Sequence, residues 1–186
     1  MQALQHVYDM DRKWYLSVNN DFATNGNIGN LEFGGTRWSM QGEWKTGYKD
    51  TRGYEAEGRL GRYIGEKQWL YPYIGADWTC RKGEAGERNM FRQTTKKDRE
   101  MDGTLGARYT LPLLLIADAR IDTDGKVRLQ LERDDIPLTS RLRLSFSLNT
   151  DQDYSVGLHY ILTSHLSVST NYDKNLHWGV GLMLTY

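Results

Sequence analysis

A two-residue alternation of apolar and polar side chains runs through most of this 186-residue chain and constrains its fold more than any other feature. Residues 141–148 (RLRLSFSL) alternate leucine or phenylalanine with arginine or serine, and the same pattern occurs in 126–133, 153–161 and 176–186. Successive side chains of a β-strand point to opposite faces, so this period predicts an all-β fold. A soluble β-sandwich alternates in the same way, and the alternation alone does not exclude one.

Aromatic residues near the ends of the alternating segments favour a membrane barrel over a sandwich. Tryptophan and tyrosine form girdles at the two bilayer interfaces of such barrels. The chain also ends in an aromatic residue on an alternating strand, which resembles the C-terminal assembly signal of bacterial barrel proteins. The girdle candidates are Trp14, Trp38, Trp44, Trp69, Trp78, Tyr109, Tyr154, Tyr172, Trp178 and Tyr186.

The connections between strands support the same interpretation. If the C-terminus is periplasmic, the one long connection, 79–100, falls outside, where such barrels carry long loops. The first two strands have the weakest pattern, so ten strands are the alternative to twelve. The predicted strands are 14–20, 29–34, 38–48, 54–63, 68–78, 101–110, 113–121, 126–133, 141–149, 153–161, 166–172 and 177–186.

We therefore expect a transmembrane antiparallel up-and-down β-barrel of the bacterial outer membrane, with lipid around it. The barrel is expected to span residues 13–186, after a short periplasmic lead-in at 1–12. The lead-in has no signal-peptide pattern, so we interpret Met1 as the start of a mature form or fragment.

Composition is compatible with a barrel and excludes several other classes. Lysine plus arginine and aspartate plus glutamate number 24 each, so no net charge points to nucleic acid. Mean hydropathy is −0.68, and no apolar run approaches the ~20 residues of a membrane helix. Neither the low mean hydropathy nor the lack of a long apolar run argues against a barrel, because the lumen-facing residues of barrel strands are polar. The single cysteine, Cys80, excludes an internal disulfide.

The same register places charges of both signs on the inward face of neighbouring strands. Buried charges need partners, so the favoured interpretation is a salt-bridge network that plugs a narrow lumen. The alternative is a selective path along which the charges pass an ion. The predicted network comprises Glu43, Glu55, Glu57, Arg59, Asp77, Asp118, Arg120, Arg128, Glu132, Arg141 and Arg143.

No arrangement of residues indicates catalysis, so an enzyme is not expected. Imidazole and thioether groups are ligands of copper, and they occur together twice in this chain. His6 and Met10 lie in the N-terminal segment. His159 and His177 are predicted to face inward two strands apart, with Met183 near His177. The alternative roles are hydrogen bonding in the lumen and, for the N-terminal pair, solvent exposure.

Parts of the chain resemble a known family, the copper-resistance protein B group of outer-membrane proteins. The similar segments are YPYIGADW (71–78), GTLGARYTLPLLL (103–115), RLQLERDDIPLTSRLRLSFSLNTD (128–151) and YILTSHLSVSTNYDKNLHWGVGLMLTY (160–186). They resemble still more the barrel extension that follows a multicopper oxidase domain in some Bacteroidetes proteins. The chain departs from the family by lacking its methionine- and histidine-rich leader, of which at most His6 and Met10 remain.

The resemblance implies a role in copper resistance. The leading hypothesis is a barrel that binds copper ions or exports them across the outer membrane, with copper as the bound metal and a multicopper oxidase as a possible partner. The alternative hypothesis is a non-metal small channel or a structural membrane anchor for a soluble partner. An outer-membrane lipase or acyltransferase would need an activated nucleophile, which the sequence does not show.

Overall fold

The computed structural model describes residues 14–48, 53–65, 67–80, 90–91, 93, 99–174 and 176–186. The predicted lead-in at 1–12 lies outside these residues. These described residues form twelve strands and one short 3-10 turn. The strands are β1 (Tyr15–Ala23), β2 (Gly26–Gly34), β3 (Trp38–Gly47), β4 (Tyr54–Arg62), β5 (Leu70–Cys80), β6 (Arg99–Leu111), β7 (Leu115–Asp122), β8 (Val127–Pro137), β9 (Leu142–Asn149), β10 (Tyr154–Ile161), β11 (Leu166–Asp173) and β12 (His177–Thr185), and the 3-10 turn η1 (Pro112–Leu114) lies between β6 and β7.

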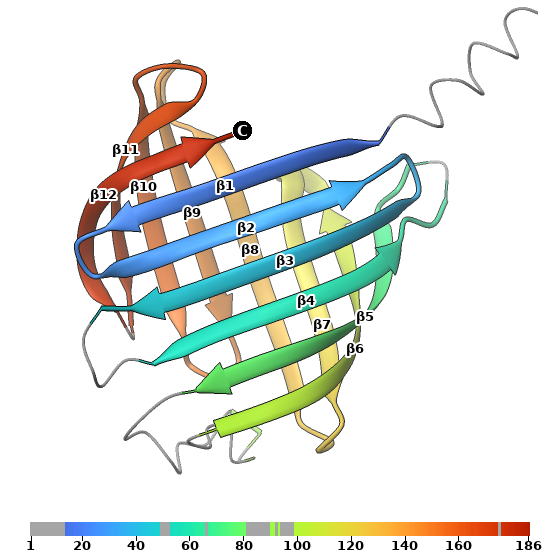
Figure 1. The fold of residues 1–186 in the computed structure, drawn as a ribbon. Coiled ribbons are helices and arrows are strands. Elements are labelled where there is room, and N and C mark those ends of the chain that lie inside the picture. The colour runs from blue at the N-terminus through green and yellow to red at the C-terminus, as the bar shows by residue number, and fades with distance from the viewer. Residues whose placement is uncertain are drawn as a thin grey trace, which may run out of the picture.

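The strands form one closed barrel in which each strand pairs antiparallel with its sequence neighbours. β1 pairs with β12 and closes the sheet, so the barrel has no free edge. In Figure 1 the strands of the near wall cross those of the far wall steeply, because barrel strands tilt against the barrel axis. The prediction of a twelve-stranded antiparallel up-and-down β-barrel is confirmed, and the ten-stranded alternative is wrong.

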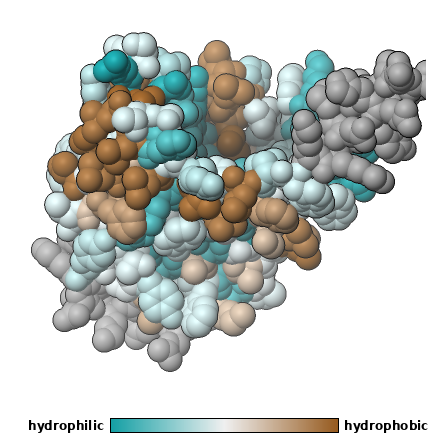
Figure 2. Space-filling model, turned by 45° about the horizontal axis from the view of Figure 1, so that its top comes forward, coloured by the Kyte–Doolittle hydropathy of each residue, from teal (hydrophilic) through white to brown (hydrophobic). Residues whose placement is uncertain are grey.

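The outer face of this barrel is apolar, as the alternation requires. Leu60, Ile74 and Leu105 are direct cross-strand neighbours on β4, β5 and β6, and all three are exposed. Figure 2 shows brown, hydrophobic side chains gathered on the outside of the barrel. An exposed apolar surface of this extent on a closed barrel is covered by lipid. The chain is therefore a transmembrane barrel of the bacterial outer-membrane type.

Aromatic side chains cluster towards both ends of the strands. At one end the rings of Trp69 and Tyr109 meet at 6.4 Å between centroids. At the other end Tyr172 lies 5.3 Å from Trp178 and 5.9 Å from Tyr154. Two separated aromatic clusters on the lipid face are the arrangement expected at the two bilayer interfaces. Among the residues that the structure describes, no helix is long and apolar enough to span a bilayer.

Strand β8 is longer than the sequence pattern predicts, because a β-bulge interrupts the alternation. The pairing of β8 with β9 shifts between Arg133 and Ile136, and Asp135 has a φ of 60°. One extra residue in a strand inverts the face of every residue after it. Residues 134–137 were expected to begin a turn at 134–140, but they belong to β8. The prediction ended the strand at residue 133 because the alternation of apolar and polar residues is interrupted at the bulge.

The first hairpin is also tighter than predicted. β1 and β2 pair from Tyr15 opposite Gly34 to Ala23 opposite Gly26, so only Thr24 and Asn25 connect them. The predicted strands 14–20 and 29–34 left a connection at 21–28, a segment in which Asp21, Asn25 and Asn27 are residue types typical of turns. In the barrel, Asp21 instead faces a polar interior, where an acidic strand residue finds hydrogen-bond donors.

Candidate functional site: the barrel lumen

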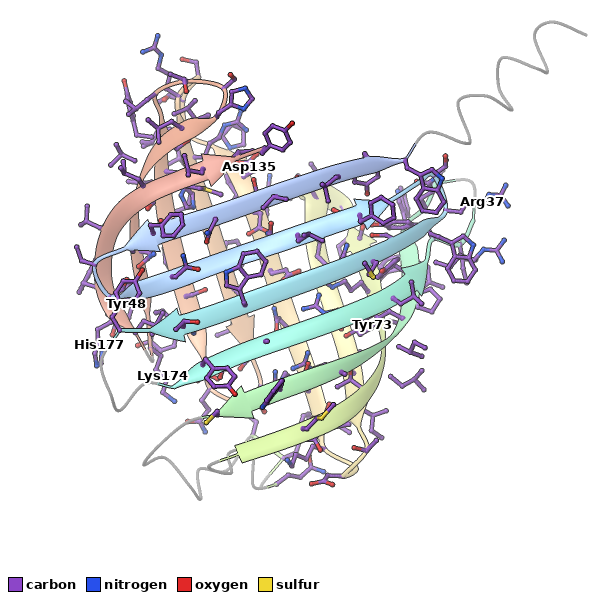
Figure 3. All side chains as sticks on the ribbon, viewed as in Figure 1. Arg37, Tyr48, Tyr73, Asp135, Lys174 and His177 are labelled. Carbon is purple, nitrogen blue, oxygen red and sulfur yellow. The ribbon has the colours of Figure 1, made fainter. Side chains whose placement is uncertain are left out.

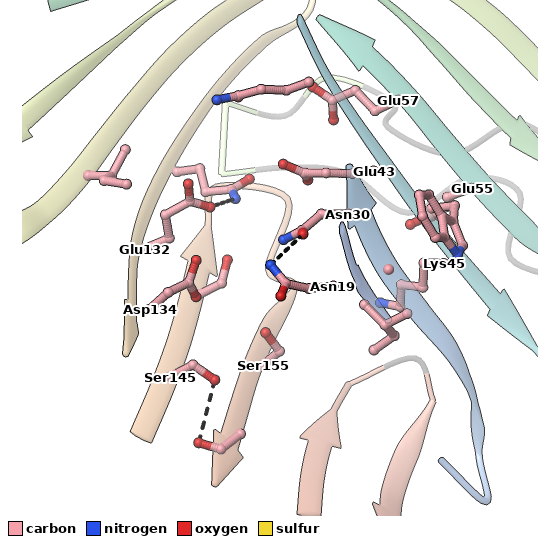
Figure 4. Close-up of a pocket in the computed structure, with 18 of the residues that line it drawn as sticks. Asn19, Asn30, Glu43, Lys45, Glu55, Glu57, Glu132, Asp134, Ser145 and Ser155 are labelled. Atoms are coloured by element: carbon pink, nitrogen blue, oxygen red, sulfur yellow. Dashed lines mark hydrogen bonds between the residues drawn. The ribbon is translucent and has the colours of Figure 1, made fainter. Parts of the chain in front are cut away.

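A cavity of about 630 Å³ occupies the middle of the barrel. The inward residues of nearly all strands line it, and Figure 4 shows side chains from opposite walls converging on it. The two halves of its wall differ in chemistry. Strands β3–β8 contribute mainly charged residues, whereas β9–β11 with β1 and β2 contribute mainly short neutral ones. The neutral residues are Ser17, Asn19, Asn30, Ser145, Ser147, Asn149, Ser155, Gly157 and Asn171.

Three arginines organise the charged half. Arg120 on β7 contacts Glu57 of β4 at 2.7 Å and Asp77 of β5 at 2.9 Å. Its side chain is almost completely buried. Arg59 on β4 contacts Glu57 and also lies 3.0 Å from Glu43 of β3. These two guanidinium groups therefore bridge carboxylates of three strands, β3, β4 and β5.

Arg108 on β6 extends the network to β8. Its Nε lies 3.0 Å from Asp118, and its Nη2 lies 3.3 Å from Glu132 and 3.5 Å from Glu43. It also donates a hydrogen bond to the side-chain oxygen of Gln41 at 3.0 Å. Because Glu43 contacts both Arg59 and Arg108, all three arginines belong to one connected network across β3–β8.

Two tyrosines support this network from within the wall. Tyr71 and Tyr73 of β5 are each only 2% exposed. The Tyr73 hydroxyl donates to Asp118 at 2.8 Å, and the Arg59 guanidinium lies 5.7 Å from the Tyr73 ring centre. The Tyr71 hydroxyl donates to the backbone carbonyl of Ser39 at 2.8 Å. Sequence analysis missed both residues, although they share the face of Asp77 by the same alternation.

The tyrosine rings fit because glycines on the neighbouring strands leave room for them. A Cβ at Gly106 of β6 would lie 2.6 Å from the Tyr73 ring. A Cβ at Gly61 of β4 would lie 2.5 Å from the Tyr71 ring. The rings therefore lie flat on the inner wall, and they fill this side of the lumen.

The remaining predicted charges lie closer to the ends of the barrel. Arg128 contacts Asp151 beside the β9–β10 turn, and Arg143 lies 3.7 Å from Asp135 in the β8 bulge. Glu55 lines the cavity. Arg141 is exposed in the turn before β9. Figure 3 shows Asp135 at the end of the barrel opposite to His177 and Lys174.

A separate cluster of neutral partners surrounds Asp21 where the barrel closes. Ser169 and Asn171 of β11 donate to the two carboxylate oxygens of Asp21, at 2.5 and 3.1 Å. Asn25 of the first hairpin donates to the Asn171 side chain at 3.0 Å. All four residues are buried. Side chains of β1 and of the first hairpin thus reach β11 across β12, which has Gly179 opposite Asn171 and Gly181 opposite Ser169.

Of the candidate metal ligands that the structure describes, the two histidines are not brought together. His159 lines the cavity and lies 3.3 Å from the Ser145 hydroxyl, and Met183 also lines the cavity. His177 is exposed at the start of β12. It pairs with Asp173, whereas His159 pairs with Ser169, so the two histidines lie about 13 Å apart along the strand direction.

The second predicted pair, His6 and Met10, lies outside the described residues. Within the described ranges, no three histidine, cysteine, aspartate or glutamate residues group as a metal site would require. No known protein family and no curated protein matches the sequence. The resemblance to copper-resistance protein B therefore stays a prediction.

The fold is similar to those of solved outer-membrane barrels. The KdgM porin in complex with disordered oligogalacturonate has a TM-score of 0.48 and 12% identity, over 92% of this chain and 98% of that one. A triple mutant of the Rhodopseudomonas blastica porin has a TM-score of 0.42 and 11% identity, over 87% and 56%. An outer membrane channel from Pseudomonas putida F1 has a TM-score of 0.40 and 12% identity, over 91% and 92%. At this level of likeness, function has to be argued from the lumen of this barrel itself.

Proposed function

We propose that this barrel is a small channel that passes hydrophilic solutes across the outer membrane. The observation that supports a channel is the polar cavity of about 630 Å³ inside a closed barrel. A barrel that served only as an anchor would be expected to fill its interior with side chains. Here the Glu43 side chain is 42% exposed although it points into the middle of the barrel, so its free surface faces the cavity.

Short side chains explain why one side of the lumen stays open. Arginines, carboxylates and tyrosine rings occupy the interior along β3–β8. Along β9–β11, serine, asparagine and glycine project only a few atoms inward, as at Ser145, Ser147 and Gly157. The proposed solute path follows this neutral wall.

Conductance in planar lipid bilayers tests the proposal. We expect discrete current steps from the refolded protein, and we expect Ser147→Trp, which adds an indole to the neutral wall, to reduce each step. Leu148→Trp is the matched control, because Leu148 is the next residue of β9 and faces lipid. Folded protein without conductance would overturn the channel and leave the anchor.

Copper passage is a second, finer candidate. It is favoured by the presence of an imidazole and a thioether in the same cavity, at His159 and Met183. The Nδ1 atom of His159 is buried without a hydrogen-bond partner among the described residues, so this nitrogen is available to a ligand. A multicopper oxidase partner belongs to this candidate and rests on the resemblance alone.

A Cu(I) and Cu(II) titration of the refolded protein tests the copper candidate. If copper binds at His159 and Met183, the unaltered protein should bind copper and the double variant His159→Ala/Met183→Ala should not. His165→Ala is the control, because His165 is an exposed turn residue. Binding lost equally in the control would indicate a surface histidine, and no binding would remove the lumen site.

A further inference from the structure

We infer that the lumen selects for small cations over anions, an inference that rests on the proposed channel. The observation that supports it is an excess of negative over positive side chains around the cavity, in a chain whose total formal charge is zero. Ten carboxylate side chains but only five cationic ones line the cavity among the described residues. The carboxylates are Asp21, Glu32, Glu43, Glu55, Glu57, Asp77, Glu132, Asp134, Asp153 and Asp173, and the cations are Lys45, Arg59, Arg108, Arg120 and Arg128.

All the cationic side chains that line the cavity are in ion pairs, whereas some of the carboxylates are not. Each of the five cations contacts at least one carboxylate, and the three central arginines contact two or three each. By contrast, Asp21, Glu32 and Asp134 have no cation within 4 Å among the described residues. These three carboxylates are therefore not paired with a cation of the described residues.

The hydrogen-bond partners of two of these carboxylates are neutral groups, which do not cancel the charge. Glu32 accepts hydrogen bonds from the Tyr15 hydroxyl at 2.6 Å and the Ser39 hydroxyl at 2.9 Å. Asp21 accepts from Ser169 and Asn171 as described above. Neutral donors stabilise a carboxylate by their dipoles, so the negative potential of these groups extends into the cavity.

One unpaired carboxylate, Asp134, and two arginine-paired ones border the open side of the lumen. Figure 4 shows Glu43, Glu132 and Asp134 directed into the same space, with Ser145 of the neighbouring strand β9 beside Asp134. The Asp134 side chain is exposed, and because it lines the cavity this exposed surface faces the lumen. A hydrated cation on the neutral wall would pass these three carboxylates and the serine hydroxyls next to them.

A narrow passage lined by one sign of charge concentrates counter-ions and excludes co-ions. Rings of aspartate and glutamate select cations in channels for this reason. Because the walls are protein and lipid of low dielectric constant, the field is weakly screened inside the lumen at low salt. We therefore expect K⁺ to permeate at least about three times as readily as Cl⁻ at low ionic strength.

The reversal potential across a tenfold KCl gradient tests the inference. We expect a cation-selective potential for the unaltered protein, a weaker one for Asp134→Asn and the weakest for Asp134→Lys. Asp124→Asn is the matched control, because it removes the same charge from the β7–β8 turn, outside the cavity, and asparagine–glycine suits the same turn.

The outcomes separate this inference from the proposed function. Absence of any current from folded protein overturns the channel itself. Current with a zero or anion-selective potential leaves the channel in place and overturns cation selectivity. An unchanged potential in both Asp134 variants, or an equal change in the Asp124 control, overturns the assignment to the lumen carboxylates.

Discussion

Arg120 illustrates at the scale of a single residue how a buried charge is held in this lumen. It is 6% exposed and contacts Glu57 and Asp77 from two other strands. Arg120→Met removes the cation, which leaves Asp77 without a cation among the described residues and Glu57 with Arg59 alone. Because uncompensated buried charges are costly, we predict a loss of about 3–5 kcal/mol in the free energy of unfolding. Urea unfolding of the refolded protein in lipid vesicles measures it.

Arg62→Met is the control for this prediction. Arg62 lies at the end of β4, where its guanidinium stacks 5.6 Å from the ring centre of exposed Trp38. Exposed cation–π contacts contribute about 0.5–1 kcal/mol, so this variant should unfold nearly as the unaltered protein does. Equal losses in the two variants would show that Arg120 contributes no more than a surface arginine.

At the scale of elements, the contact between β1, β11 and β12 is sensitive to one glycine. A Cβ at Gly179 would lie 2.0 Å from the Asn25 side-chain oxygen and 2.6 Å from that of Asn171. These atoms belong to the hydrogen-bonded cluster around Asp21 that links β1 to β11. We predict that Gly179→Ala lowers the temperature at which the folded band is lost on unheated gels, because the cluster has to separate.

Gly58→Ala distinguishes this steric effect from the general effect of a strand glycine. Gly58 also lies in the middle of a strand, but a Cβ there would meet no atom within 4 Å. Alanine restricts the unfolded chain more than glycine does, so Gly58→Ala should leave stability unchanged or raise it slightly, by up to about 1 kcal/mol. A comparable loss of stability in both variants would argue against the clash at Gly179.

At the scale of the whole molecule, the apolar outer face of the barrel, here called the apolar belt, determines its position in a bilayer. Ile74 is 60% exposed in the middle of β5, with apolar neighbours on both adjacent strands. An arginine at the bilayer midplane costs about 2–4 kcal/mol in such barrels. We therefore predict that Ile74→Arg lowers the folded fraction in vesicles, measured by the gel shift between folded and heated protein.

Leu113→Arg is the matched control for the belt. Leu113 is 74% exposed, more than Ile74, but it lies in the turn between β6 and β7. Its substitution exposes the new charge to water or lipid headgroups, so the folded fraction should change little. If both variants fold poorly, exposure alone rather than depth in the bilayer explains the effect.

Sequence alone was sufficient for the class of fold and for the inward or outward direction of most side chains, and it favoured the correct strand number over ten strands. The reason is that side-chain direction in a strand depends only on parity along the chain, which a sequence displays directly. The bulge at Asp134 and Asp135 marks the limit of this reasoning, because one extra residue changes parity without any local signal in the sequence.

Only the tertiary structure decided which inward residues meet. His159 and His177 share the inward parity, yet the β10–β11–β12 register separates them along the barrel. Asp21 and Ser169 are 148 positions apart, yet they hydrogen-bond, because closure of the barrel brings β1 next to β12. The open cavity has the same origin, since its width depends on how far apart opposite walls lie, and local sequence carries no information about that distance.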